Sequence, residues 1–417
     1  MLSGLAVLRA QASQDDLIDP RSAPVLSEQS RPETRVLAPR RGSRRLVAAI
    51  DDVIYTGFTE VSGTDIANFE NAVARKIALP QYLGLTRGQE DLSIPLDLNV
   101  EEATGLWNAG YVTMTGAYEA KPFDGFTVDR LLSGEFDAQL HALAERFKAF
   151  GHPIFFSTAR EPNGVLVQSL GGFGADGSLD AASATDKVGL FDPSKLPTAH
   201  LADKNLFQGL GDPAACDGLE RLAAAQRYYY DFFVQREGID FLTFDSMGLN
   251  VRPAPKGEEP CEDYEALLRL IAGYVDWASL NWYFIQESEA SEPPLTTRGA
   301  RLTTWMDTVR SILPGKPVLL TELGFCKTPA GPGATTVDAK IEYGMGEILS
   351  NYPEIHGFMH WGESAPPFDC GITSSNGGAT FKRVLDENDA RFSSCVNFSD
   401  GTTVPNCDPK NLSQPIP

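Results

Sequence analysis

The sequence predicts an α/β fold in which eight parallel strands, alternating with helices, close into a barrel. Two observations lead to this prediction. Short apolar or β-rich segments recur between residues 46 and 362, and helix-patterned stretches separate them. Strands that alternate with helices pair in parallel through right-handed crossovers, and eight such units favour closure. An open, doubly wound sheet is the alternative, because periodicity does not count strands reliably.

The expected strands are short apolar runs, which is typical of parallel strands covered on both faces. They span residues 46–56, 76–85, 110–119, 153–161, 239–247, 275–284, 316–325 and 355–362. The helices between them show apolar residues at helical spacing. They span 64–75, 99–108, 135–150, 217–237, 262–273, 299–313 and 336–351, and a last helix is expected at 380–390. The pattern predicts one (β/α)8 TIM-barrel domain.

Three segments depart from this rhythm. Residues 1–44 are rich in Arg, Ser, Pro and Gln and lack apolar periodicity, so we expect a flexible leader before a barrel domain at 45–390. The Gly-, Asp-, Ser- and Pro-rich stretch 165–216 follows the fourth strand. We interpret it as an inserted loop on the mouth side of the barrel. Residues 391–417 are expected to form a tail that wraps the surface.

The charge balance bounds the partners of this chain. Its 56 acidic and 35 basic side chains give a net charge of −21, which repels phosphate backbones and anionic membranes. No stretch approaches the roughly 18 to 20 apolar residues of a membrane helix. We therefore expect no nucleic-acid or membrane partner, and we expect a monomer.

The six cysteines are even in number and widely spaced, without a C-x-x-C pair. Such a set fits disulfides in an exported protein, although six unrelated buried thiols are the alternative. The first ten residues make a poor signal peptide, with a short, interrupted apolar run and no preceding charge. We expect a secreted, extracellular protein without a clear signal peptide in this chain.

Two of the expected strands end in a glutamate. Glu161 closes the run 153–161 just before Pro162, and Glu322 lies near the end of 316–325. The carboxyl ends of barrel strands converge, so both side chains can face the mouth. Cleavage of a glycosidic bond needs one group to protonate the leaving oxygen and another to meet the charge at the sugar carbon. Two carboxyl groups with separated pKa values supply both functions.

The run from Pro153 to Gly164 resembles the strand and acid/base motif of glycoside hydrolase family 26, whose retaining barrel enzymes include β-mannanases. Further segments are similar to the family in the same order. They are the helix from Phe136 into Gly151-His-Pro, the Tyr-rich helix 217–237, Tyr274–Tyr283, Lys316–Glu322 and Phe358–Trp361. The resemblance covers about residues 46 to 390, which is the whole expected domain.

The resemblance implies roles for four residues. Glu161 corresponds to the general acid/base and Glu322 to the nucleophile. Tyr283 corresponds to the tyrosine that hydrogen-bonds the nucleophile and keeps it ionised and oriented. Trp361 corresponds to the aromatic platform beneath the sugar whose bond is cut, since sugar faces pack on aromatic rings. The implied substrate is a β-linked polysaccharide, with mannan as the leading candidate and cleavage by double displacement.

The chain departs from the family at two places beside the acid/base residue. Arg160 replaces the usual histidine, and a permanently charged neighbour tends to lower a carboxyl pKa, whereas a general acid needs a raised one. Residues 165–170 replace the aromatic residues that usually follow the motif. The alternatives are therefore xylan or mixed-linkage β-glucan as substrate, or a non-catalytic glycan-binding barrel. Further expected sugar contacts are Arg160, Asn163, Trp282 and Tyr118.

Other chemistries find little support in the sequence. A G-x-G-x-x-G pattern occurs at 172–177, but it lies late in the chain before a weak helix, so a mouth loop is the better interpretation than a nucleotide site. The five histidines form no H-E-x-x-H motif, and no G-x-S-x-G elbow is present. We expect no cofactor and no catalytic metal.

The barrel arrangement also predicts the cysteine pairs. Cys326 follows the seventh strand and Cys370 the eighth, so a bridge between their neighbouring loops would clamp the mouth beside Glu322. The other predicted pairs are Cys216 with Cys261 and Cys395 with Cys407.

Overall fold

The fold is taken from a computed structural model of the chain. The described residues are 53–60, 63–82, 98–116, 128–159, 191–212, 215–250, 264–284, 295–327, 335–362, 369–398, 402–408 and 410. The chain divides into two compact units, 1–37 and 38–417, and every described residue belongs to the second. The expected leader, 1–44, lies outside the described residues.

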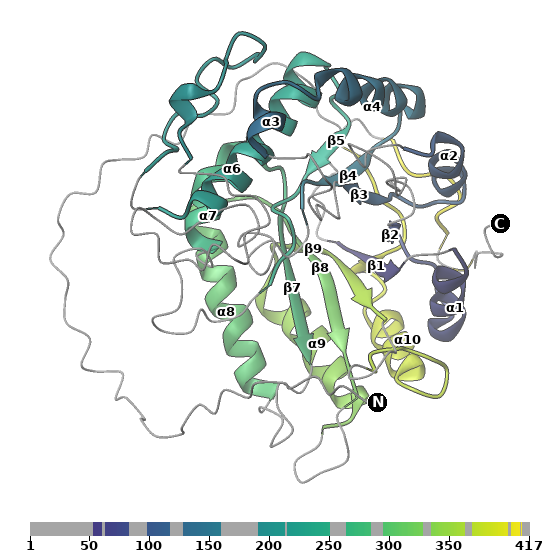
Figure 1. Ribbon diagram of the computed structural model, residues 1–417. Helices are drawn as coiled ribbons and strands as arrows, with labels where there is room; N and C mark the ends of the chain where they lie inside the picture. The colour runs from purple at the N-terminus through teal and green to yellow at the C-terminus, as the bar shows by residue number, and fades with distance from the viewer. Residues whose placement is uncertain are drawn as a thin grey trace, which may run out of the picture. The chain divides into compact units, whose positions relative to one another are not determined.

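The second unit is organised around a sheet in which all pairings between named strands are parallel (Figure 1). Its strands are β1 (Ile54–Glu60), β2 (Leu79–Tyr82), β3 (Met114–Gly116), β4 (Ile154–Ser157), β5 (Leu242–Phe244), β6 (Leu249–Asn250), β7 (Ala278–Phe284), β8 (Val318–Phe325), β9 (Ile355–Trp361) and β10 (Phe392–Ser393). They are ordered β5-β4-β3-β2-β1-β9-β8-β7-β6, with β10 on β1. Each of the eight expected strand ranges overlaps one of these strands, which confirms the parallel α/β prediction.

The two ends of this sheet are joined by a short turn. The fifth expected strand, 239–247, contains β5, whereas β6 begins after the end of that range, and residues 245–248 separate the two. Met247 there has φ 72° and Gly248 has φ 54°, a left-handed conformation that ends strand geometry. The backbone N–H groups of Asp276 and Trp277 donate to the Phe244 carbonyl at 2.7 and 3.2 Å. Within the described residues no ladder pairs β5 with β6, so the closed barrel stays a prediction.

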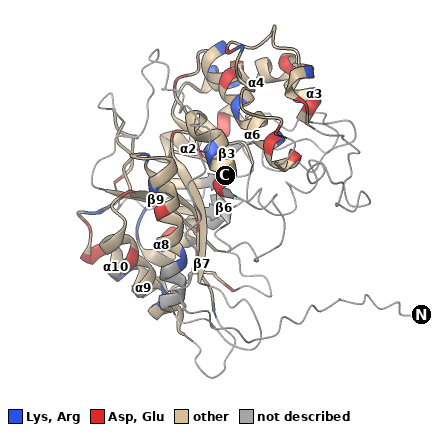
Figure 2. Ribbon diagram, turned by 90° about the vertical axis from the view of Figure 1, so that its left-hand side faces the viewer, with Lys and Arg blue, Asp and Glu red and all other residues tan. Residues whose placement is uncertain are grey.

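Helices follow most strands, and all of the described ones except α3 overlap an expected range. They are α1 (Gly63–Val73), α2 (Val100–Asn108), α3 (Val128–Leu132), α4 (Asp137–Phe150), α6 (Asp217–Tyr230), α7 (Tyr264–Ile271), α8 (Leu295–Ile312), α9 (Val337–Asn351) and α10 (Gly378–Glu387). Their ends carry ordinary signals: Asn99 and Thr336 cap α2 and α9, and Gly151 ends α4 in the left-handed region. In Figure 2 charged residues lie along helices such as α3, α4 and α10, whereas β7 carries none.

The strands bury different side chains on their two faces. On β4, Phe156 meets Phe147 of α4 at 6.0 Å between ring centroids and Phe244 of β5 at 5.2 Å, so this face lies toward the helices. Its neighbour Phe155 instead meets Trp277 at 5.3 Å. Successive strand residues point to opposite faces, so Phe155 lies on the face of the sheet turned away from these helices. Both faces are therefore apolar, as the continuous apolar runs of the sequence predict.

The stretch expected as an inserted loop, 165–216, is described from residue 191. This part lies against α6 and the π-helical turn η3 (Asp231–Arg236) that continues it. Asp231 accepts hydrogen bonds from the backbone N–H groups of Ala202 and Asp203 at 2.9 and 2.8 Å. Arg227 donates to the Leu206 carbonyl at 2.9 Å. The described part thus packs on an outer helix, and a place for the insertion at the mouth stays a prediction.

The start of the expected tail is part of the packed unit. β10 pairs with the first residues of β1, and Val396 and Phe398 are buried beyond it. A disulfide joins Cys395 to Cys407, as predicted. Among the described residues, no helix is both long and apolar enough to cross a membrane.

Candidate active site

Strand β8 carries Glu322, which corresponds to the nucleophile in the resemblance to glycoside hydrolase family 26. All eight of its residues are buried, and Glu322 is only 1% exposed although it bears a carboxyl group. Burial of a carboxylate is costly unless it is paired or hydrogen-bonded. A glutamate within this largely apolar strand therefore lowers the stability of the fold, which indicates a functional reason for its position.

The neighbouring strand β7 supplies a hydrogen-bond donor to this carboxylate. Asn281 is the register partner of Glu322, and Tyr283 is the register partner of Gly324, after a register shift between Leu280 and Asn281. The Tyr283 hydroxyl donates a hydrogen bond to Oε2 of Glu322. A neutral donor of this kind favours the ionised form of a carboxylate and fixes its direction. The structure thus brings together the expected nucleophile and the residue expected to orient it.

Strand β9 adds the tryptophan expected as a sugar platform. Trp361 is the last residue of β9 and is partly exposed. Its ring centroid lies 5.2 Å from that of Tyr283, with the planes at 74°. Glu322, Tyr283 and Trp361 therefore form one cluster at the carboxyl ends of three adjacent parallel strands. Ligand sites of α/β folds gather at this edge of the sheet.

Two polar side chains beside Glu322, those of Thr321 and Asn281, were not predicted. The Thr321 hydroxyl donates to Oδ1 of the buried Asn281 at 2.7 Å, which ties β8 to β7 next to the carboxylate. Asn281 could have been found from the sequence, because it precedes Tyr283 by two residues and must share its face of β7.

Asp245 is a second unpredicted feature of this interior. It follows β5, is fully buried, and accepts a hydrogen bond from the Met247 backbone N–H at 3.1 Å. Burial raises the pKa of Asp245 to about 6, an effect that the hydroxyls of Ser157 and Ser279 oppose. The signal in the sequence is the pair Asp245-Ser246 directly after the apolar run of the fifth strand.

The backbone after Glu322 is held by a buried histidine on β9. The two ring nitrogens of His360 lie 2.9 Å from the Leu323 carbonyl and 3.0 Å from the Cys370 carbonyl. Burial lowers the pKa of His360 to about 4, while the two carbonyls act in the opposite direction. Cys370 is disulfide-bonded to Cys326, which confirms the predicted clamp between the segments after β8 and β9. The residues that follow Glu322 on β8 are thus fixed from two sides.

Trp282 was expected to contact sugar, and the structure places it elsewhere. Its side chain is buried and lies 4.6 Å from Phe284, measured between ring centroids, on the face of β7 opposite to Tyr283. Phe284 in turn contacts Tyr343 of α9 at 6.2 Å. Trp282 is therefore a core residue between the sheet and the helices, because adjacent strand residues point to opposite faces.

Four expected site residues lie outside the described residues: Glu161, Arg160, Asn163 and Tyr118. The described segment that contains β4 ends at Ala159, two residues after the strand. The Ser157 hydroxyl donates to the Ala159 carbonyl at 2.7 Å. The predicted acid/base residue and its separation from Glu322 accordingly stay predictions. Of the third predicted disulfide, Cys216 is disulfide-bonded, and Cys261 lies outside the described residues.

Within the described residues, one group has the composition of a metal site. It consists of His141 and Glu145 on α4 with Glu237, which lie close enough to share an ion. However, the Lys148 ammonium lies 2.8 Å from a carboxylate oxygen of Glu145 and 2.8 Å from one of Glu237. This lysine already supplies the positive charge, so the group is explained as a surface ion-pair network.

Comparison with known proteins gives similarity in structure alone. No family model matches the sequence, and no curated protein matches it. The Bacillus subtilis mannanase BCman is similar with 14% identity and a TM-score of 0.47, over 85% of this chain and 91% of the mannanase. The catalytic domain of the Bacillus sp. JAMB-750 GH26 endo-β-1,4-mannanase is similar with 13% identity and a TM-score of 0.49, over 80% of this chain and 86% of that domain. A double mutant of the Cellulomonas fimi endo-β-1,4-mannanase is similar with 13% identity and a TM-score of 0.48, over 87% of this chain and 74% of the mannanase. At such identities the roles of individual residues depend on the geometry of the site itself.

Proposed function

We propose that the chain is a retaining glycoside hydrolase that cleaves a β-linked polysaccharide, with mannan as the leading substrate. The observation that carries this proposal is the cluster at the carboxyl ends of β7, β8 and β9. A buried carboxylate, Glu322, accepts a hydrogen bond from Tyr283, and the ring of a partly exposed Trp361 meets the same phenol ring in an edge-to-face contact.

This arrangement meets the needs of a carboxylate nucleophile. The attacking group has to be ionised and aimed at the sugar carbon, and a neutral phenol donor favours both without cancelling the charge. A partly exposed indole beside it offers an apolar surface for a sugar ring. A structural carboxylate would gain more from a cationic partner, so a phenol fits a reactive role better.

We further propose that the strands close into a (β/α)8 barrel. β5 and β6 lie at opposite ends of the sheet order, yet only residues 245–248 separate them. An isolated parallel bridge between Asp245 and Trp277 continues from β5 toward β7. Closure would bring the carboxyl end of β4, and with it Glu161, to the same mouth as Glu322.

The reaction would then proceed in two displacements. Glu322 attacks the anomeric carbon and forms a glycosyl ester while Glu161 protonates the departing oxygen. Glu161 next removes a proton from water, which attacks the same carbon, releases the sugar with retained configuration and restores the Glu322 carboxylate. A retaining pair requires carboxyl groups about 5.5 Å apart, whereas about 9 Å indicates inversion.

The disulfides support a secreted enzyme. Cys326–Cys370 and Cys395–Cys407 are both bonded, and structural disulfides persist in oxidising compartments. A secreted hydrolase also fits a polymeric substrate that does not enter cells.

Release of reducing sugar from mannan, xylan and mixed-linkage β-glucan tests the proposal. The parent, a Glu322→Ala variant and a Glu101→Ala control on the exposed surface of α2 are compared. We expect the parent and the control to hydrolyse one polymer, with mannan first, and Glu322→Ala to be inactive. Equal background rates for the parent and Glu322→Ala on every polymer would favour a glycan-binding barrel without catalysis. Binding of the polymers by both proteins would then identify that alternative.

A further inference from the structure

We propose that Gly324 is a positioning residue that sets the Tyr283 ring against Glu322. A side chain at this position would displace the Tyr283 hydroxyl from the proposed nucleophile and lower the rate. The inference deepens the proposed function and rests on it. Gly324 lies two residues after Glu322 on β8 and is the direct register partner of Tyr283 on β7.

The backbone does not explain why glycine occupies this position. Gly324 lies within the extended strand β8 and is absent from the described glycines with positive φ. Every residue type adopts an extended conformation, and glycine weakens a strand interior because it adds entropy to the unfolded chain and nothing to the packing. The reason for glycine here must therefore be space.

The space above Gly324 is taken by the Tyr283 ring. A Cβ atom at Gly324 would lie 2.7 Å from Cδ1 of Tyr283, a distance that real Cβ atoms essentially never show. The same atom would lie 3.4 Å from Cε3 of Trp361 and 3.4 Å from Sγ of Cys326, which are tolerable contacts. Of these three neighbours, only the Tyr283 ring would have to move.

The Tyr283 ring has little freedom to move without a catalytic consequence. Its hydroxyl is bound to Oε2 of Glu322, and its ring meets Trp361 at 74°. A displacement that relieves the overlap at Cδ1 would change the direction of the hydroxyl. Because misplacement of a catalytic group by about 1 Å can cost about 100-fold in rate, the loss at Gly324 should appear in kcat.

The chain offers a matched control in the adjacent strand β9. A Cβ atom at Gly357 would lie 2.8 Å from Cδ1 of Leu319 and 3.1 Å from Cδ1 of Leu79, a comparable overlap against core leucines. Gly357→Ala should therefore lower the free energy of unfolding as Gly324→Ala does, but leave kcat and its pH dependence within about twofold of the parent.

The experiment measures kcat, KM, pH profile and unfolding for Gly324→Ala, Gly357→Ala, Tyr283→Phe and the double variant Tyr283→Phe/Gly324→Ala. We expect Gly324→Ala to lose about 10- to 100-fold in kcat, with KM nearly unchanged. The acidic limb of its pH–rate profile should move to higher pH. In the Tyr283→Phe background, which keeps the ring but lacks the hydroxyl, Gly324→Ala should cost less than about twofold more in kcat. The stability effects should instead add, because the overlap with the ring is the same in both backgrounds.

Two outcomes would overturn the inference. One is an unchanged kcat and pH profile in Gly324→Ala. The other is an equal fold-loss from Gly324→Ala in both backgrounds, which would mean that Gly324 does not act through the Tyr283 hydroxyl.

A further variant covers the case in which Gly324→Ala does not fold. Tyr283→Ala/Gly324→Ala removes the ring that the new methyl group meets. Folding of this double variant supports the overlap with Tyr283, and its failure contradicts that overlap. If the parent is inactive on every polymer, the proposed function fails, and crystal structures of the parent and Gly324→Ala still decide the inference. The position of the Tyr283 hydroxyl relative to Glu322 should differ between the two.

Discussion

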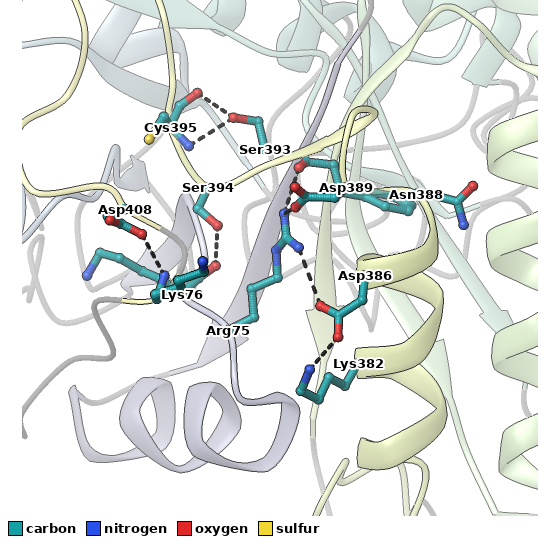
Figure 3. A network of polar contacts seen from close by, with 12 residues as sticks. Arg75, Lys76, Lys382, Asp386, Asn388, Asp389, Ser393, Ser394, Cys395 and Asp408 are labelled. Carbon is teal, nitrogen blue, oxygen red and sulfur yellow. Dashed lines mark hydrogen bonds and ion pairs between the residues drawn. The ribbon is translucent and has the colours of Figure 1, made fainter.

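Two regions of the sheet treat buried charge in different ways. Where α1, α10 and β10 meet, the buried Arg75 lies 2.7 Å from an Asp389 oxygen and donates to the Phe392 carbonyl at 2.9 Å (Figure 3). At the other end of the strands, the buried Glu322 accepts a hydrogen bond from Tyr283, a neutral group. The first charge is neutralised by its partners, whereas the second is oriented by a donor that leaves the charge in place.

Under the proposed function, the difference separates a region that stabilises the fold from one that prepares chemistry. An arginine with carboxylate and carbonyl partners ties the segment after α1 to α10 and β10. A carboxylate held by a phenol remains a nucleophile. Substitutions around Arg75 should therefore lower the free energy of unfolding and leave the rate unchanged. Substitutions around Glu322 should lower the rate with little loss of stability.

The largest effect is expected from Glu322→Gln. This change keeps the shape of the side chain and its ability to accept from Tyr283, but removes the nucleophilic oxygen. We expect kcat to fall by at least about 10³-fold, as for other essential nucleophiles. The free energy of unfolding should stay equal or rise, because a buried charge is removed. Comparable hydrolysis by Glu322→Gln and the parent would remove Glu322 from the mechanism.

A smaller rate effect is expected from Tyr283→Phe, which deletes only the hydroxyl. The carboxylate loses the donor that favours its ionised form, so we expect kcat to fall by about 10- to 100-fold. The acidic limb of the pH–rate profile should move to higher pH. Steady-state kinetics between pH 4 and pH 8 check this. An unchanged profile together with a large loss of stability would make Tyr283 a packing residue.

The contrasting substitution is Arg75→Met, which keeps the length of the side chain and removes its hydrogen bonds. We expect the free energy of unfolding to fall by about 2 kcal/mol, because the buried Phe392 carbonyl loses its donor and two partly exposed aspartates lose their ion pair. Urea denaturation measures this change. The rate should stay within about twofold of the parent, and a loss of activity at full stability would contradict the division between the regions.

The smallest effect concerns the pH dependence of stability through Asp245. Its folded-state pKa is raised to about 6 from an ordinary 3.8, so its contribution to stability is present at low pH and is lost as the pH rises between these values. For His360 the folded-state pKa is lowered to about 4 from 6.5, so its contribution is lost as the pH falls through that window. Asp245→Asn should remove the first effect and leave the second. The free energy of unfolding should then rise more steeply with pH between 4 and 6, by at most about 1.4 kcal/mol per pH unit. An unchanged slope in urea titrations would contradict this assignment.

The positions of most strands and helices could be predicted from the sequence, because buried parallel strands leave apolar runs and outer helices leave a 3.6-residue period. Two features could not. The fifth strand was expected to run to residue 247 and β6 was not expected, because nothing in the composition marks the left-handed backbone at Met247. β10 has only two residues and exists through its pairing with β1 and the hydrogen bond from Arg75.

The site shows the same division between local pattern and tertiary context. Glu322, Tyr283 and Trp361 were predicted because the segments that contain them resemble glycoside hydrolase family 26 and lie toward the carboxyl ends of expected parallel strands, which converge. Trp282 was placed wrongly, although the alternation of β7 puts it opposite Tyr283. Asp245 and the role of Gly324 depend on which side chains meet across strands, and a single sequence does not state this.

The most direct test of the account is covalent trapping of the nucleophile. An activated 2-deoxy-2-fluoro-β-mannobioside slows both displacements, and its good leaving group lets the first one proceed, so the glycosyl-enzyme accumulates. Mass spectrometry of peptides from the inactivated enzyme should find one sugar ester, on Glu322, and none in Glu322→Gln. A label on Glu161 or on another carboxylate, or turnover with inverted configuration, would contradict the assignment.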